Sequence, residues 1–351
     1  LGEGAESGLS PGTEWVRTNP MLITALIPSM GAPPAPVAAS YFDEFHATAV
    51  QLWMDGPAEV GSWQQARPAA PFISWLDTDG TSVVWNGTGF ESSGVVLGNL
   101  EAGLAGRLGY QVGDEPLTID VLQDIEAGIA AVRDADPGAL VFTNFSYHVP
   151  DLAEMLDYVV ASVDTDIVMV SDYFLDDLHY GVLAEFRETG LEKGVPYWQY
   201  LNAYAGVESA LAPIHTESDL RWEAMAGLTY GFTGHSWFFY QAAAEGHPTA
   251  TTWGGSVLHD GVGDWSAPRT PQWGIVAEIN EELANLGRVV TQLTSTDVRL
   301  IIAEDERVAQ PLGTVPWAAG AGGDPYLSGI TAAEGELPMD ILVGFFRDAV
   351  G

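Results

Sequence analysis

Residues 108–116 read Leu-Gly-Tyr-Gln-Val-Gly-Asp-Glu-Pro, a short and largely apolar run that stops at two adjacent carboxylates and a proline. Proline donates no hydrogen bond to a β-ladder and biases the residue before it toward an extended geometry, so a strand must end here. Because side chains alternate along a strand, we expect Asp114 and Glu115 to point to different sides. A plain turn is the alternative interpretation, since Gly, Asp and Pro are all turn residues.

Seven further apolar, β-branched or aromatic runs recur along the chain, which makes eight candidate strands. Their apolarity is continuous rather than alternating, and this favours strands that are buried on both faces, as in a parallel sheet. The other seven runs are Met21–Ile27, Ala49–Met54, Phe72–Leu76, Ala139–Phe145, Ile167–Tyr173, Val195–Leu201 and Gly234–Tyr240.

Segments in which apolar residues recur with helical spacing lie between several of these runs. Residues 121–132 place Val121 and Ile125 on one face, and a Thr-x-x-Asp capping signal at 216–219 precedes another such helix. Strand–helix alternation repeated this often predicts a parallel α/β fold, and eight repeats favour a closed (β/α)8 TIM barrel over an open sheet. The remaining predicted helices are Tyr41–His46, Leu152–Val160, Val182–Leu191 and Gln272–Gln292.

The expected barrel covers residues 18–295, and the segments on either side differ from it. Residues 1–17 are interpreted as a flexible N-terminal segment. Residues 296–351 contain two short apolar runs, Val298–Ile302 and Ile341–Phe346, around a stretch rich in Gly, Ala and Pro. We interpret 296–351 as a small β-rich subdomain or the start of an accessory module.

Charge and composition exclude several classes of function. The net charge is −36, from 48 acidic and 12 basic residues, so neither nucleic acid nor an anionic membrane is an expected partner. Salt adaptation explains such a charge as well as a functional acidic patch does. Cysteine is absent, and the seven histidines show no ligand-type spacing, so we expect no metal and no cofactor. A secreted or periplasmic location is expected, although residues 1–14 carry no signal-peptide pattern; the oligomeric state is left open.

In a barrel of this kind, functional side chains gather at the carboxyl ends of the strands. Polar and aromatic residues do follow the predicted strands here. Aromatic plates stack on sugar rings, amides and carboxylates bind hydroxyl groups, and bond cleavage needs two carboxyl groups, so we expect a carbohydrate ligand. The candidate binding residues are Trp53, Asp55, Trp75, Asn144, Tyr173, Trp198, Gln199, Asn202, His235, Trp237 and Tyr240.

A fourth strand that ends in Asp-Glu-Pro resembles the acid/base strand of the clan-A-type (β/α)8 glycoside hydrolases. The resemblance extends as a pattern over roughly residues 20–295 and implies that Glu115 is the general acid/base. It also implies a nucleophilic glutamate at the end of the seventh strand. The chain departs from the family there, because that strand carries Gln199 and the next carboxylate is Glu208.

Two candidates remain for the second carboxylate. Asp172 on the sixth strand is favoured, as base or nucleophile, because adjacent residues on an extended strand diverge. A separation of about 6.5–9.5 Å from Glu115 would indicate inversion, and about 5 Å retention; the wider gap is slightly favoured. Alternatively, Asp114 orients a substrate N-acetyl group while Glu115 protonates the leaving oxygen, as in substrate-assisted hexosaminidases.

Two other classes of function stay open. A carbohydrate-binding barrel that has lost its nucleophile would explain Gln199. A lyase that acts on uronic-acid polymers is less favoured, because Lys and Arg are scarce near the predicted strand ends.

Overall fold

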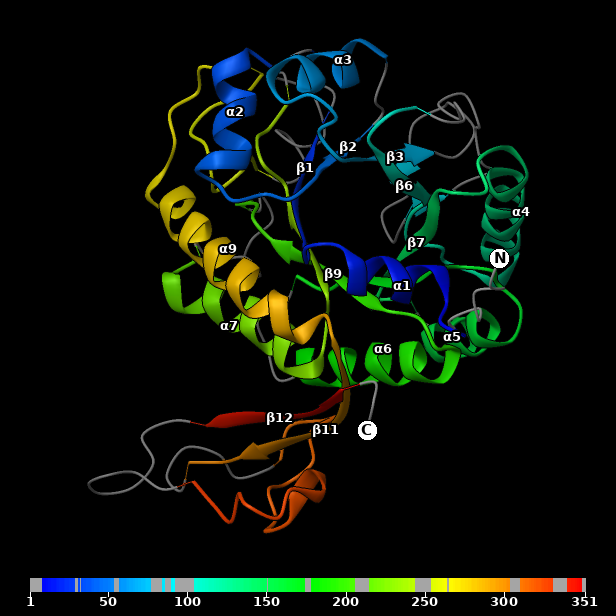
Figure 1. Cartoon of the computed structure of the whole chain (residues 1–351), viewed down its shortest axis with the longest axis vertical. Coiled ribbons are helices and arrows are strands. Elements are labelled where there is room, and N and C mark those ends of the chain that lie inside the picture. Colours follow the sequence, from blue (N-terminus) through cyan, green and yellow to red (C-terminus); the bar gives the residue numbers. More distant parts are fainter. Residues whose placement is uncertain are drawn as a thin grey trace, which may run out of the picture.

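The computed structural model describes residues 8–28, 31, 33–53, 57–76, 84–85, 90–91, 104–149, 151–173, 178–205, 215–243, 254–263, 265–303, 310–330 and 340–348. Within this part of the chain, eight parallel strands close into a barrel in the order β1-β10-β9-β8-β7-β6-β3-β2 (Figure 1). The predicted (β/α)8 TIM barrel is therefore confirmed. Its strands are β1 (Leu22–Ile27), β2 (Val50–Leu52), β3 (Phe72–Leu76), β6 (Arg107–Val112), β7 (Leu140–Ser146), β8 (Ile167–Ser171), β9 (Tyr197–Asn202) and β10 (Gly234–Phe238).

Helices surround the barrel and cover its outer face (Figure 1). Between β3 and β6 the chain carries a separate two-stranded sheet, β4 (Val84–Trp85) with β5 (Phe90–Glu91). The helices around the barrel are α2 (Ala35–Asp43), α3 (Pro57–Ala66), α4 (Ile119–Ala135), α5 (Leu152–Ala161), α6 (His179–Lys193), α7 (Glu217–Tyr230) and α9 (Pro271–Val290).

Both faces of the barrel strands are buried, as their continuous apolarity predicts. On β8, Ile167 and Met169 belong to the core inside the barrel, whereas Val168 and Val170 pack in the layer between the strands and the helices. Continuing this alternation, Ser171 faces inward and the next residue faces the helices. This alternation between inward-facing and outward-facing side chains decides which of the predicted residues can meet inside the barrel.

A short helix, α1 (Pro11–Thr18), crosses the amino end of the barrel (Figure 1). Ser10 caps it, and the Ser10 hydroxyl also donates a hydrogen bond of 2.8 Å to the carbonyl of Gly194, just before β9. Val16 is buried in the inner core. Residues 11–18 therefore differ from the flexible segment expected over 1–17, because one face of this helix closes the barrel.

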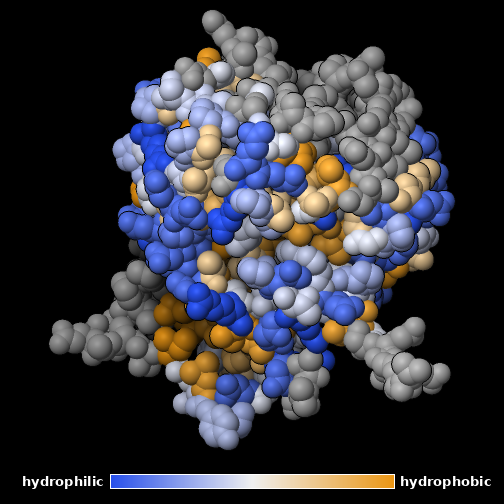
Figure 2. All heavy atoms as spheres, turned by 45° about the horizontal axis from the view of Figure 1, so that its top comes forward, coloured by the Kyte–Doolittle hydropathy of each residue, from blue (hydrophilic) through white to orange (hydrophobic). Residues whose placement is uncertain are grey.

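The C-terminal segment is β-rich, as expected. Strands β11 (Leu293–Ile301) and β12 (Ile341–Asp348) form a two-stranded antiparallel sheet, with a short 3-10 turn, η1 (Ala321–Gly323), beside it. In Figure 2, hydrophilic residues cover much of the barrel surface in view, and hydrophobic ones gather below, where this C-terminal unit lies. Among the described helices, none is both long and apolar enough to cross a membrane.

Candidate active site

The chain turns sharply where β6 ends. Gly113 has a φ of +66°, and Glu115 has a φ of +41°, a left-handed conformation that is rare for a residue with a side chain. The backbone N–H of Glu115 donates a hydrogen bond of 2.8 Å to the carbonyl of Asn144 at the end of β7. The expectation that Asp114 and Glu115 diverge rested on an extended backbone, and β6 already ends at Val112.

The two carboxylates lie in one hydrogen-bond network. Asp114 Oδ1 accepts hydrogen bonds from Gln111 Nε2 at 3.1 Å and from Asn144 Nδ2 at 2.9 Å. Asn144 Nδ2 also lies 3.2 Å from Ser171 Oγ, which donates a hydrogen bond of 2.5 Å to Glu115 Oε1. An amide and a hydroxyl therefore connect Asp114 to Glu115.

The network continues across the inside of the barrel. Gln111 Oε1 accepts from Gln51 Nε2 at 2.8 Å and from the Tyr200 hydroxyl at 2.7 Å. Gln51 Oε1 in turn accepts from Ser236 Oγ at 2.7 Å. Connected polar side chains inside a protein hold one another in a single arrangement, so the carboxylates rest on a rigid polar layer. Sequence reasoning did not select Gln51, Ser171, Tyr200 or Ser236.

The surroundings of Glu115 favour its protonated form. Burial raises the pKa of Glu115 above its ordinary value, and the Ser171 hydrogen bond opposes this rise. Burial, followed by the nearby charge of Glu115, also raises the pKa of Tyr204 to about 12 and that of Tyr173 well above its usual value. Burial and the charge of Asp114 do the same for Tyr200, so these tyrosines stay neutral hydroxyl donors.

Aromatic rings flank the network. Tyr173 stacks on Phe238 at a centroid distance of 5.3 Å and meets Tyr204 edge-on at 5.4 Å. Trp53, just after β2, stacks on Trp75 of β3 at 5.4 Å. The carboxyl end of the barrel therefore combines two carboxyl groups with aromatic rings.

Asp172 faces the helices and not the interior of the barrel. Its Oδ2 lies 2.8 Å from His179 Nδ1 at the start of α6, and both side chains are only 2% exposed. Its charge also acts on Glu223 of α7, whose pKa burial already raises. Strand alternation is the reason, because Ser171 takes the inward position. These contacts favour a structural role for Asp172.

Four further predicted residues lie away from the network. Gln199 Nε2 lies 3.1 Å from His235 Nδ1, and a Cβ added to Gly227 of α7 would meet the Gln199 amide at 2.1 Å, so this pair faces the helix layer. Burial lowers the pKa of His235 to about 3. Trp237 and Tyr240 also face the helices. Trp237 donates a hydrogen bond there, and the Tyr240 ring packs against other aromatic rings. Their partners are Asn280 for Trp237 and Tyr41, Phe45 and Trp273 for Tyr240.

Two predicted residues of the seventh strand face inward at its opposite ends. Trp198 packs against Trp15 of α1, at the amino end of the barrel. Asn202 ends β9, and its Nδ2 donates a hydrogen bond of 3.1 Å to the carbonyl of Tyr173 while its Oδ1 accepts one of 3.2 Å from the Tyr204 N–H. An amide thus stands where the resemblance implies a nucleophile. Asp55 lies outside the described residues.

In the part of the chain that the structure describes, no three or more His, Asp and Glu side chains are grouped to hold a metal ion. Hydroxyl, amide and carboxyl groups therefore make up the chemistry of the described network.

No model of a protein family matches the chain, and neither does any curated protein. Among solved structures, the GH113 β-mannanase of Alicyclobacillus acidocaldarius is 12% identical, with a TM-score of 0.49 over 79% of this chain and 100% of that one. The endo-β-1,4-mannanase of Thermotoga petrophila is 12% identical, with a TM-score of 0.46 over 82% of this chain and 81% of that one.

The carboxyl transferase domain of Rhizobium etli pyruvate carboxylase is also similar, at 12% identity and a TM-score of 0.44 over 81% of this chain and 50% of that one. Enzymes of different chemistry thus resemble the chain to a similar degree. These likenesses carry no functional assignment, and the barrel rests on its own strand order.

Proposed function

We propose that the protein is a glycoside hydrolase in which Glu115 is the proton donor. The observation that carries this proposal is the position of Glu115 after the fourth barrel strand, in a left-handed backbone conformation and hydrogen-bonded to Ser171. Such strained residues cost about 1–3 kcal/mol and cluster at functional sites. Burial raises the pKa of Glu115, as a general acid that works near neutral pH requires.

We further propose that Asp114, and not Asp172, is the second carboxylate. Two amides hold Asp114 Oδ1, and the same network reaches Glu115 through Ser171. In this scheme the acetamido oxygen of the substrate attacks the anomeric carbon while Glu115 gives its proton to the leaving oxygen, and Asp114 orients the acetamido N–H. Glu115 then takes a proton from the water that opens the cyclic intermediate. No enzyme nucleophile is needed, which fits an amide at Asn202.

A carbohydrate-binding barrel without catalysis is the second candidate. The observation that favours it is also Asn202, since an amide at the end of the seventh strand supplies no nucleophile. The aromatic rings around Tyr173 would serve binding alone equally well.

The test is hydrolysis of oligosaccharides with and without 2-acetamido groups, such as chitooligosaccharides against cello- and manno-oligosaccharides. We expect reducing sugar only from the acetamido substrates, and a loss of about 100-fold or more in kcat for Glu115→Gln, the usual scale for a general acid. Glu278→Gln, an exposed acid on α9, is the matched control and should retain activity.

Asp114→Asn tests the second carboxylate, because it should impair turnover of the acetamido substrates if Asp114 orients the acetamido group. Retention of full activity in Glu115→Gln would refute the catalytic proposal. Saturable binding without any reducing sugar would instead support the non-catalytic barrel.

A further inference from the structure

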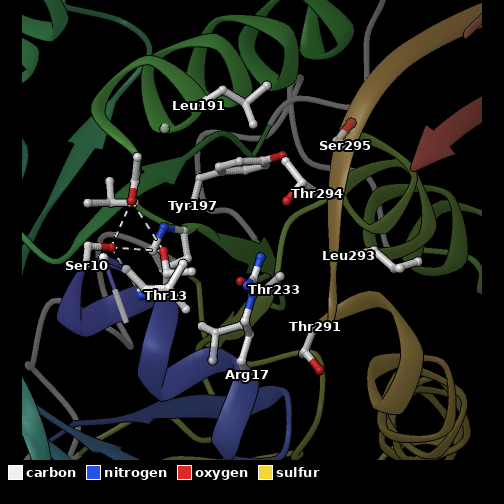
Figure 3. Close-up of a pocket in the computed structure, with 18 residues that line it drawn as sticks. Ser10, Thr13, Arg17, Leu191, Tyr197, Thr233, Thr291, Leu293, Thr294 and Ser295 are labelled. Carbon is white, nitrogen blue, oxygen red and sulfur yellow. Dashed lines mark hydrogen bonds between the residues drawn. The ribbon is translucent and has the colours of Figure 1, made fainter. Parts of the chain in front are cut away.

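A cavity lies at the opposite end of the barrel from Glu115. It has a volume of about 300 Å³ and lies between α1, the turn before β9, the turn before β10 and the start of β11 (Figure 3). The hydroxyls of Ser10 and Thr13 both bond to the carbonyl of Gly194, which fixes α1 as one wall. This volume is at the lower end of the range for small-molecule sites, about 300–1,000 Å³.

The charge of this amino-end pocket is opposite to that of the molecule. The net charge of the chain is −36, yet none of the described residues that line the pocket is acidic. Figure 3 shows Arg17 extending from α1 into the pocket on the side of Thr233. Arg187 adds a second positive charge just behind the wall, where its Nε donates a hydrogen bond of 2.8 Å to Ser295. Among the described residues, neither arginine forms an ion pair.

One buried hydroxyl in the pocket lacks a partner. Thr233 is 7% exposed, and within the described structure its Oγ1 makes no hydrogen bond. Buried polar groups are nearly always hydrogen-bonded, and leaving one unsatisfied is costly, so a polar ligand that reaches this wall can supply the missing partner. Thr294 and Ser295 also line the pocket (Figure 3), and the Ser295 hydroxyl accepts from Arg187.

We propose that this amino-end pocket binds a monosaccharide that carries a negative charge, namely a uronic acid or a sugar phosphate. The cavity is large enough for one sugar ring, its threonine and serine hydroxyls can accept hydrogen bonds from sugar hydroxyls, and Arg17 supplies a planar cation suited to a carboxylate or a phosphate. The site is separate from Glu115, so the ligand is not the one that is cleaved.

The experiment is calorimetric titration of the full chain with glucuronate, glucose 6-phosphate, glucose and inorganic phosphate. We expect saturable binding of glucuronate or glucose 6-phosphate, and the one that binds identifies the anionic group. Arg17→Gln should weaken this binding about tenfold or more, as the loss of a charge-assisted hydrogen bond does. Thr233→Val should weaken it about three- to tenfold without lowering the Tm of the free protein, because the hydroxyl that is lost has no partner there.

Two controls keep the result specific. Arg67→Gln removes the same charge just after α3, where the arginine pairs with Asp43, and should leave binding unchanged. Glu115→Gln should also bind normally, which separates this site from the proposed activity. No saturable binding of either charged sugar, an equal loss in Arg67→Gln, or equally tight binding of glucose or of inorganic phosphate alone would overturn the proposal.

Discussion

Glu115 is held between two opposing influences on its protonation. Burial disfavours the carboxylate and raises the pKa, whereas the hydrogen bond from Ser171 stabilises the carboxylate and lowers it. The balance leaves the pKa above its ordinary value. A general acid is active only while protonated, so activity should be lost as pH rises through this raised pKa. The alkaline side of the pH profile therefore reports on Glu115.

Ser171→Ala should move that alkaline limb to higher pH. The substitution removes the only influence identified as lowering the pKa of Glu115, so the carboxyl keeps its proton further into the alkaline range. The measurement is kcat/KM against pH for both proteins. Ser146→Ala is the control, because Ser146 lies beside Ser171 on β7 and its hydroxyl accepts from the His148 N–H instead. A limb that moves to lower pH would contradict this account.

At the scale of elements, α7 supports the site from outside the barrel. Its Glu223 accepts a hydrogen bond of 2.8 Å from the backbone N–H of Asn202, whose side chain in turn holds Tyr173 and Tyr204. The helix begins with a capping box in which Thr216 and Asp219 satisfy each other's backbone N–H groups. A buried helix fixed at its first turn keeps Glu223, and through it the end of β9, in place.

Thr216→Ala should destabilise the protein by about 1 kcal/mol, the typical cost of losing an N-cap. The Thr216 side chain accepts from the Asp219 N–H, and alanine leaves that donor without its acceptor. Urea unfolding checks the value. Thr216→Ser keeps the hydroxyl and should retain most of the stability, so an equal loss in both variants would show that the cap is not responsible.

The elements themselves follow from the sequence, and the orientation of side chains on them does not. All eight apolar runs became barrel strands, because length and continuous apolarity identify a strand that is buried on both sides. Because apolar residues occupy every position of such a strand, the sequence does not show which side chains point into the barrel. The choice of Asp172 over Ser171, and of Gln199 over Tyr200, was an error of one residue in parity. Similarly, a sharp turn with positive φ values at Gly113 and Glu115 follows β6, and alternation alone could not reveal it.

For the whole molecule, charge is the dominant feature. With 48 acidic and 12 basic residues, most carboxylates have no cation to pair with, so the folded state carries strong self-repulsion. Salt screens such repulsion over distances of about 10 Å at 0.1 M. The same imbalance makes the two arginines at the amino-end pocket a local exception.

The Tm should therefore rise with salt. Between 10 mM and 1 M NaCl we expect an increase of at least about 1–2 °C, the scale of a stabilisation near 1 kcal/mol for a domain of this size. Scanning calorimetry at neutral pH measures it, and repetition at a pH where the carboxylates are protonated should largely remove the dependence. A Tm that is flat or falling at neutral pH would show that the acids are already compensated.

The docking of α1 has a consequence for the order in which a growing chain can fold. Ser10 bonds to Gly194, 184 residues later, and the carbonyl of Arg17 accepts from Gln292, 275 residues later. β1 likewise closes the barrel by pairing with β10. On the ribosome, α1 therefore emerges long before its partner residues are synthesised. Val16, which is buried in the folded core, stays exposed until then. Contacts this distant in sequence form slowly and late. The amino end of the barrel is thus sealed last, and a nascent chain that stalls before Gly194 leaves it open.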